Sequence, residues 1–184
     1  MINNIFLRII LYLKRYKLFR SLGKLVINRM VYYHIATPED AEDILQHFPY
    51  KKGPEKNKTK EQLTQELKDS KDKEFFFMAK TNGRIIGKSA ITLYPKRENP
   101  NHWAFSSFYV YQEYRGLGIG EKLLRLALKK AEESGATEIV LSVFDHLKPA
   151  IHLYRKVGFK HVSSHRRDDE NHSLVHIYVY RPLE

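Results

Sequence analysis

The sequence lacks cysteine, and this absence removes a class of chemistry. With no cysteine among its 184 residues, the chain has neither disulfides nor thiolate chemistry. Such a composition suits a reducing compartment, so we expect a cytoplasmic protein. A length of 184 residues allows one domain of ordinary size with a real hydrophobic core.

Long apolar runs are also missing from the first part of the chain. A transmembrane helix needs about 20 apolar residues, whereas the longest uninterrupted run in residues 1–30 is Ile9–Leu13. Arg8 interrupts the apolar stretch, no positive side chain precedes it, and no small-residue cleavage site follows. We therefore expect neither a membrane-spanning helix nor a signal peptide here.

Acidic residues are absent from residues 1–30, which carry seven Lys and Arg side chains. This segment holds seven of the net eleven positive charges, so the rest of the chain carries only four. We expect residues 1–29 to be a basic, apolar extension and residues 30–184 to form the main domain. Three partners stay open for the extension: the domain itself, a second copy forming a homodimer, or an anionic membrane surface, to which the protein would be peripheral. Nucleic acid fits least, because aliphatic side chains suit lipid or protein better than stacked bases.

Three glycines at alternating positions, Gly116, Gly118 and Gly120, stand between two regular patterns. Residues 103–110 are rich in aromatic and β-branched side chains, which predicts a strand. From 120 to 131 apolar residues recur at helical spacing, which predicts a helix with one buried face. The amides at a helix start have no intrahelical partner, and glycines let a phosphate group approach them. With Arg115 beside it, this junction is predicted to bind phosphate.

Two common phosphate motifs do not fit this stretch. A dinucleotide fingerprint would need a third glycine at Glu121, and a P-loop would need Lys and then Ser or Thr directly after Gly120. The pattern that fits is R-x-x-G-x-G, and a second pattern, A-x-x-L-Y-x-K-x-G-F, follows at residues 150–159. Together they resemble the motifs of the GCN5-related N-acetyltransferase (GNAT) superfamily, and weaker likeness extends from about residue 31 to 181.

The resemblance implies a co-substrate and a reaction. Acetyl-coenzyme A would supply an acetyl group to an acceptor amine, with Arg115 and the loop amides holding its pyrophosphate. A main-chain N–H near Val110 would bond the thioester oxygen. Tyr154 would protonate the departing thiolate, because a phenol with a pKa of about 10 is protonated at neutral pH. The implied cofactor-binding residues are Phe108, Tyr109, Val110, Arg115, Gly116, Leu117, Gly118, Ile119, Gly120 and Glu121.

Two departures from the superfamily keep a second function open. Leu147 stands where the superfamily often has asparagine, and the strand at 103–110 has no carboxylate to act as a base. A water chain ending at Glu98, His102 or Asp145 is an alternative. The two candidate functions are an N-acetyltransferase acting on a small molecule or peptide, and a non-catalytic coenzyme A-binding or interaction module localised by its basic segment.

The order of predicted elements over residues 30–181 is β-α-α-β-β-β-α-β-α-β-β. It matches the α/β fold of the superfamily, a mixed and mostly antiparallel sheet flanked by helices. Thr37 and Thr59 are predicted to start the first two helices, and Asn82–Gly83 to form a tight hairpin turn. No metal site is expected, because histidine pairs on the last two strands, 161 with 165 and 172 with 176, have no acid or cysteine to complete a ligand set.

Overall fold

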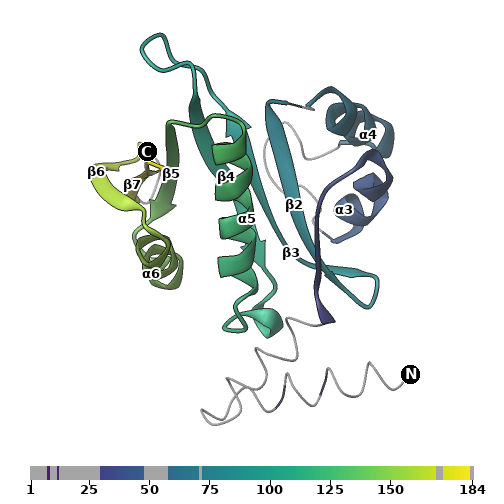
Figure 1. Ribbon diagram of the computed structural model, residues 1–184. Helices are drawn as coiled ribbons and strands as arrows, with labels where there is room; N and C mark the ends of the chain where they lie inside the picture. Colours follow the sequence, from purple (N-terminus) through teal and green to yellow (C-terminus); the bar gives the residue numbers. More distant parts are fainter. Residues whose placement is uncertain are drawn as a thin grey trace. The chain divides into compact units, whose positions relative to one another are not determined.

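The computed structural model describes residues 8, 12, 30–47, 58–70, 72–168 and 172–182. Within this part of the chain, seven strands form one sheet in the order β1-β2-β3-β4-β5-β7-β6 (Figure 1). The strands are β1 (Tyr32–Ile35), β2 (Glu74–Thr81), β3 (Arg84–Leu93), β4 (His102–Val110), β5 (Glu138–Phe144), β6 (Lys160–Arg166) and β7 (Leu174–Tyr180). The helices are η2 (Pro38–Asp40), α3 (Ala41–His47), α4 (Lys60–Asp69), η4 (Gln112–Tyr114), α5 (Ile119–Glu133) and α6 (Lys148–Val157). The predicted order of elements and the mixed α/β fold are confirmed.

The chain divides into two compact units. The first contains Met1–Ala90 and Ser107–Leu124, and the second contains Ile91–Ser106 and Arg125–Glu184. The glycine loop and the end of β4 belong to the first unit, whereas Tyr154 belongs to the second. Of the predicted extension at residues 1–29, the structure describes Arg8 and Tyr12, both helical, and the remainder lies outside the described residues. No helix in the described segments is long and apolar enough to cross a membrane.

In the first unit, helices α3 and α4 pack together beside β2 (Figure 1). Strand β1 pairs antiparallel with β2, from Tyr32 opposite Lys80 to Ile35 opposite Phe77. The shared core consists of Ala41, Ile44, Leu63, Leu67, Met78 and Ile85. Burial of these apolar side chains holds the helix pair on the strands.

Local sequence signals set the ends of these elements. The Thr59 hydroxyl accepts a hydrogen bond from the Gln62 amide at 3.2 Å, and the Gln62 side chain accepts one from the Thr59 amide at 2.9 Å. This reciprocal pair is the predicted capping box of α4. The turn between β2 and β3 has positive φ at both central residues, 48° at Asn82 and 73° at Gly83, as a two-residue hairpin turn requires.

In the second unit, β4 and β5 are parallel, while β7 lies antiparallel to both β5 and β6. Helix α6 buries Ile151, Tyr154 and Val157 on one side. It ends at Gly158, whose φ of 115° is in the left-handed region that favours glycine. The sheet is therefore mixed, with one parallel pair at β4–β5 and antiparallel pairs at β5–β7 and β6–β7, as expected for a mixed, mostly antiparallel sheet.

Candidate functional site

The glycine loop joins the end of β4 to the start of α5. The short helix η4 leads from the strand to Arg115, and α5 begins at Ile119. Gly116 and Gly118 have φ values of 78° and 88°, which other residues adopt only with strain. The Lys122 amide donates to the Gly118 carbonyl at 3.0 Å, so helical bonding begins at the second glycine. The first two glycines are thus required by the backbone itself.

The loop leaves room for a ligand at Gly118. A Cβ placed there would meet no neighbouring atom within 4 Å. The amides of the first helical turn have no intrahelical acceptor, and the helix dipole favours an anion beside them. Leu117 and Ile119 are almost completely buried, at 0% and 1% exposed. Their side chains anchor the loop, so these two predicted binding residues can contribute only main-chain groups.

Arg115 lies beside the loop, as predicted, but its side chain turns back to the strand. Its Nε donates to the Val110 carbonyl oxygen at 2.8 Å. Its guanidinium lies over the Tyr109 ring, 5.7 Å from the ring centre. The sequence gives no signal for the hydrogen bond from Arg115 to Val110, because this bond depends on how the turn between the two residues folds.

Gly87 in β3 is a residue that the sequence analysis missed. A Cβ at this position would lie 3.1 Å from Leu123 Cδ1, 3.2 Å from the Tyr109 carbonyl oxygen and 3.3 Å from Val110 Cγ2. Glycine therefore permits the close approach of β3 to the end of β4 and to α5. A glycine inside a strand pattern is the signal that would have identified it.

In β4, the alternation of buried and exposed side chains is interrupted before the predicted thioester-binding residues. Ser107 has a positive φ of 50°, and both Ser106 and Ser107 are exposed, which is typical of a β-bulge. The parallel register with β5 runs from His102 opposite Glu138 to Ala104 opposite Val140, and both strands continue beyond it. The paired register therefore ends before Phe108, Tyr109 and Val110, the residues predicted to lie at the thioester.

Tyr154, in the second unit, lies on the buried face of α6. Only 6% of the residue is exposed. Its ring meets Phe105 edge-on with 6.2 Å between ring centres, and Phe159 at 5.9 Å. Burial raises the pKa of the Tyr154 hydroxyl well above 10, so it remains protonated at neutral pH. This is the protonation state that a general acid requires.

Two of the three suggested base residues lie around the loop before β4. Glu98 is exposed in a turn between β3 and β4. His102 is the first residue of β4 and only 3% exposed. Its Nδ1 lies 3.2 Å from Glu138 Oε1, an ion-pair distance without hydrogen-bond geometry. Seven residues of β4 lie between His102 and Val110, and Glu98 precedes the strand, so neither candidate base lies at the end of β4.

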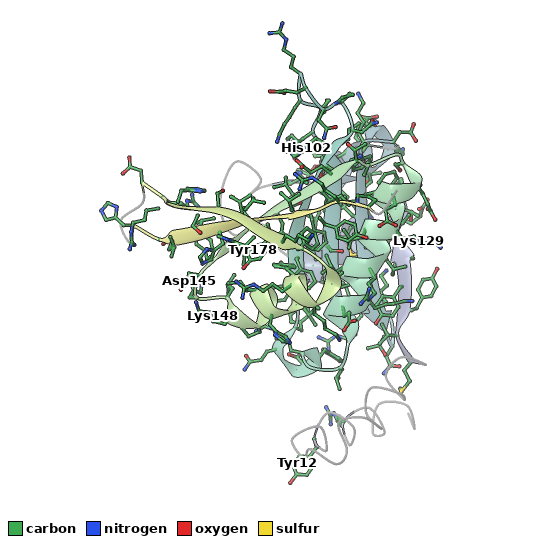
Figure 2. All side chains as sticks on the ribbon, turned by 60° about the vertical axis from the view of Figure 1, so that its left-hand side comes forward. Tyr12, His102, Lys129, Asp145, Lys148 and Tyr178 are labelled. Atoms are coloured by element: carbon green, nitrogen blue, oxygen red, sulfur yellow. The ribbon has the colours of Figure 1, made fainter. Side chains whose placement is uncertain are left out.

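Asp145 is held in an ion network where β5 leads into α6. Its Oδ1 accepts from His176 Nε2 at 2.9 Å and from Lys148 Nζ at 2.5 Å, and Figure 2 shows Asp145 and Lys148 side by side. The hydrogen bonds from His176 and then Lys148 lower the pKa of Asp145 to about 2. A carboxylate with so low a pKa is a weak base at neutral pH.

The histidines of β6 and β7 interact across the two strands. Ser164 Oγ lies 2.7 Å from His176 Nδ1 and 2.8 Å from His161 Nε2, and the two imidazole rings are 5.3 Å apart. The histidine pairs noted in the sequence lie along single strands, because local spacing carries no information on the cross-strand register. Within the described segments, no group of three or more His, Asp or Glu side chains is arranged to hold a metal ion.

Leu147, which replaces the superfamily asparagine, occupies the N-cap of α6. Its carbonyl accepts from the amides of Ala150 and Ile151 at 3.0 and 3.1 Å, and its side chain makes no capping bond. Asparagine is a favoured N-cap residue, because its side chain can accept from the free amides of the first turn. Leucine offers no such acceptor, so this helix begins without a side-chain cap.

Comparison with known sequences agrees with the two motifs. Residues 39–159 match the model of the acetyltransferase (GNAT) family. The chain is 35% identical over 103 residues to an N-alpha-acetyltransferase of Sulfurisphaera tokodaii, covering 47% of this chain and 57% of that protein. It is 30% identical over 83 residues to the spermine/spermidine N(1)-acetyltransferase of Bacillus subtilis, covering 42% and 54%. The chain thus spans a little over half the length of these two relatives.

Solved structures share the fold at low sequence identity. An acetyltransferase of the GNAT family from Streptococcus pneumoniae superposes with a TM-score of 0.72 at 23% identity, covering 83% of this chain and 99% of that one. The protein yncA from Salmonella typhimurium, solved with its cofactor acetyl-CoA, gives a TM-score of 0.71 at 14% identity, covering 84% and 95%.

Proposed function

The chain belongs to the acetyltransferase (GNAT) family, and we propose that it transfers an acetyl group from acetyl-coenzyme A to an amine of a small molecule or peptide. The observation that carries this proposal is the glycine loop. Gly116 and Gly118 adopt left-handed backbone conformations directly before α5, and a Cβ at Gly118 would point into open space. This is the arrangement that brings helix-start amides within reach of a phosphate group.

Main-chain groups would bind acetyl-coenzyme A at two places, its pyrophosphate and its thioester. The amides from Gly116 to Glu121 would receive the pyrophosphate, and Arg115 would place a positive charge beside them. The main-chain N–H of Val110, with Phe108 and Tyr109 before it, would bond the thioester oxygen. Such a donor stabilises the negative charge that develops on this oxygen during attack.

The reaction would proceed by direct attack. The amine nitrogen bonds to the thioester carbon, the carbon–sulfur bond breaks, and the thiolate takes a proton from the Tyr154 hydroxyl. Burial raises the pKa of this phenol and keeps it protonated at neutral pH; it also makes the phenol a weaker acid, so the charge that develops on the sulfur must draw the proton away. Because β4 carries no carboxylate, we assign removal of the amine proton to water.

The accessory role of residues 1–29 also remains a proposal. Their charge supports attachment to an anionic membrane surface, and their apolar residues support packing on the domain or on a second copy of the chain. Either role would leave the acetyl-transfer site in residues 30–184.

A thiol-release assay across a panel of amines tests the activity. Polyamines, free amino acids and short peptides would each be mixed with protein and acetyl-coenzyme A, and free thiol followed with a chromogenic reagent. The protein has no cysteine, so it adds no thiol background. We expect at least one class of amine to accelerate thiol release. Binding of acetyl-coenzyme A without acceleration by any amine would instead indicate a non-catalytic binding module.

A further inference from the structure

One side chain ties the glycine loop to the end of β4. Arg115 stands directly before Gly116, the first glycine of the loop. Its Nε hydrogen bond to the Val110 carbonyl oxygen, at 2.8 Å, reaches back five residues. The guanidinium is flanked by the Tyr109 ring at 5.7 Å. The loop and the strand end are therefore joined by a contact in addition to the chain between them.

The peptide group after Val110 is held at both of its polar atoms. Its carbonyl oxygen accepts from Arg115, and its nitrogen, the Tyr111 amide, donates to the Ile86 carbonyl oxygen at 3.0 Å. Because a peptide group is planar, bonds at both atoms fix its orientation and so restrict rotation about the Val110 backbone.

The two tyrosines on either side of Val110 support the same arrangement. The Tyr111 ring packs against the core shared by α3 and α4, and it meets the Tyr109 ring edge-on with 5.4 Å between centres. Tyr109 is 40% exposed, so its ring is held by Tyr111 and Arg115 rather than by deep burial. An aromatic face beside a guanidinium attracts it electrostatically.

We infer that Arg115 is a positioning residue that aligns the end of β4 with the glycine loop, and that Tyr109 holds its guanidinium in place. The inference rests on the proposed function, in which the Val110 N–H bonds the thioester oxygen. The Val110 N–H belongs to the preceding peptide group, which meets the fixed one at the Val110 Cα, so the two bonds limit the directions that this N–H can take while the loop binds the pyrophosphate. Lysine at position 115 would keep the positive charge but lose the planar donor that reaches Val110.

Infrared difference spectroscopy tests the alignment without an acceptor amine. Acetyl-coenzyme A labelled with carbon-13 at the carbonyl is bound to each variant, and the carbonyl stretch is compared with that of free ligand. A hydrogen bond to the oxygen lowers this frequency. We expect the full shift in the wild type, and more of it in Tyr109→Phe, which keeps the ring, than in Tyr109→Leu. Arg115→Lys should lose most of the shift and Tyr109→Leu part of it, while the exposed control Arg97→Lys keeps all of it.

A fragment of the co-substrate separates positioning from phosphate binding. Adenosine 3′-phosphate 5′-diphosphate carries the diphosphate but no thioester, and we expect Arg115→Lys to weaken its binding no more than it weakens binding of acetyl-coenzyme A, since the charge is kept. A full carbonyl shift in both Arg115→Lys and Tyr109→Leu would overturn the inference. The inference would also be overturned if Arg115→Lys lost affinity for the fragment and kept the full carbonyl shift. A wild-type protein that binds no acetyl-coenzyme A, or binds it with no shift, would instead overturn the proposed function.

Discussion

Burial sets the acid–base behaviour of Tyr154. Two aromatic rings, Phe105 and Phe159, surround it, and burial raises its pKa. We predict that Tyr154→Phe lowers kcat by about a hundredfold, because the thiolate loses its proton donor. The ring is retained in this variant, so affinity for acetyl-coenzyme A should change little.

Steady-state kinetics and calorimetry measure the two quantities separately. If Tyr154→Phe lost affinity and kept its turnover, the hydroxyl would be a packing group rather than an acid.

The raised pKa also predicts that the hydroxyl of Tyr154 does not ionise between pH 7 and its ordinary value of 10.0. In an ultraviolet titration, the wild type and Tyr154→Phe should therefore show the same phenolate absorbance at each pH in that range.

Leu147 is a second residue whose effect is local. At the N-cap of α6 it offers no side-chain acceptor, although Pro149 has no N–H to donate and the Ala150 amide already donates to the Leu147 carbonyl. We therefore predict that Leu147→Asn raises the free energy of unfolding by about 0.5 kcal/mol, the low end for an N-cap, measured by urea denaturation. Leu147→Ala is the matched control, since it removes the same exposed side chain without adding an acceptor. Equal stability of the Asn and Ala variants would show that the helix start is satisfied in another way.

At the scale of elements, the carboxylate of Asp40 joins η2 to strands β1 and β2. Asp40 Oδ1 accepts from Lys80 Nζ at 2.6 Å, and Oδ2 accepts from the Thr37 amide at 2.9 Å and lies 2.9 Å from His34 Nε2. Burial by itself raises the pKa of Asp40, but the hydrogen bonds from Lys80, Thr37 and His34 outweigh it and hold the pKa below 3.8.

The sign of this shift fixes the pH dependence. A carboxyl whose pKa is lower in the folded state stabilises the protein above its unfolded pKa and loses that contribution as the pH falls through the folded value. We predict that Asp40→Asn lowers the free energy of unfolding by about 2 kcal/mol at pH 7, and that the difference shrinks as the pH falls below 3.8. Urea denaturation across this range is the measurement, with the exposed Asp72→Asn as control. An equal loss at every pH would contradict a charge-based contact.

Elements with local signals were predictable from the sequence, and contacts between distant residues were not. Strand β5 (Glu138–Phe144) and helix α6 (Lys148–Val157) occur in the predicted order of elements, because turn residues and apolar periodicity mark such elements in the sequence. The positive φ of Ser107, the burial of His102 and the turn of Arg115 toward Val110 have no local sequence pattern. Each depends on which strands become neighbours, and that is settled only when the chain folds.

At the scale of the whole molecule, the charge asymmetry predicts a dispensable segment. We predict that deleting residues 1–29 leaves acetyl-coenzyme A affinity unchanged. If the segment docks on anionic membrane, each basic residue near the surface contributes about 1 kcal/mol, and added salt weakens the binding. Calorimetry, sedimentation and retention on vesicles containing phosphatidylserine measure the three properties.

The outcomes of the deletion separate the proposals. Lost vesicle retention would favour membrane attachment, whereas changed sedimentation without vesicle binding would favour packing on a second copy. A folded truncated domain that no longer binds acetyl-coenzyme A would contradict the accessory role of residues 1–29.

The central claim is that acetyl-coenzyme A binds at the glycine loop, and two glycines provide a matched pair to test it. Gly118 and Gly83 both have positive φ, 88° and 73°, and a Cβ at either would meet nothing within 4 Å. Leucine at either position therefore introduces backbone strain of about 1–2 kcal/mol without a clash. Only Gly118 lies in the loop.

Isothermal calorimetry of the two folded variants with acetyl-coenzyme A is the direct measurement. We predict that Gly118→Leu abolishes detectable binding, because its side chain occupies the space where phosphate approaches the amides, and that Gly83→Leu binds like wild type. Unchanged affinity in Gly118→Leu, or an equal loss in both variants, would contradict the account.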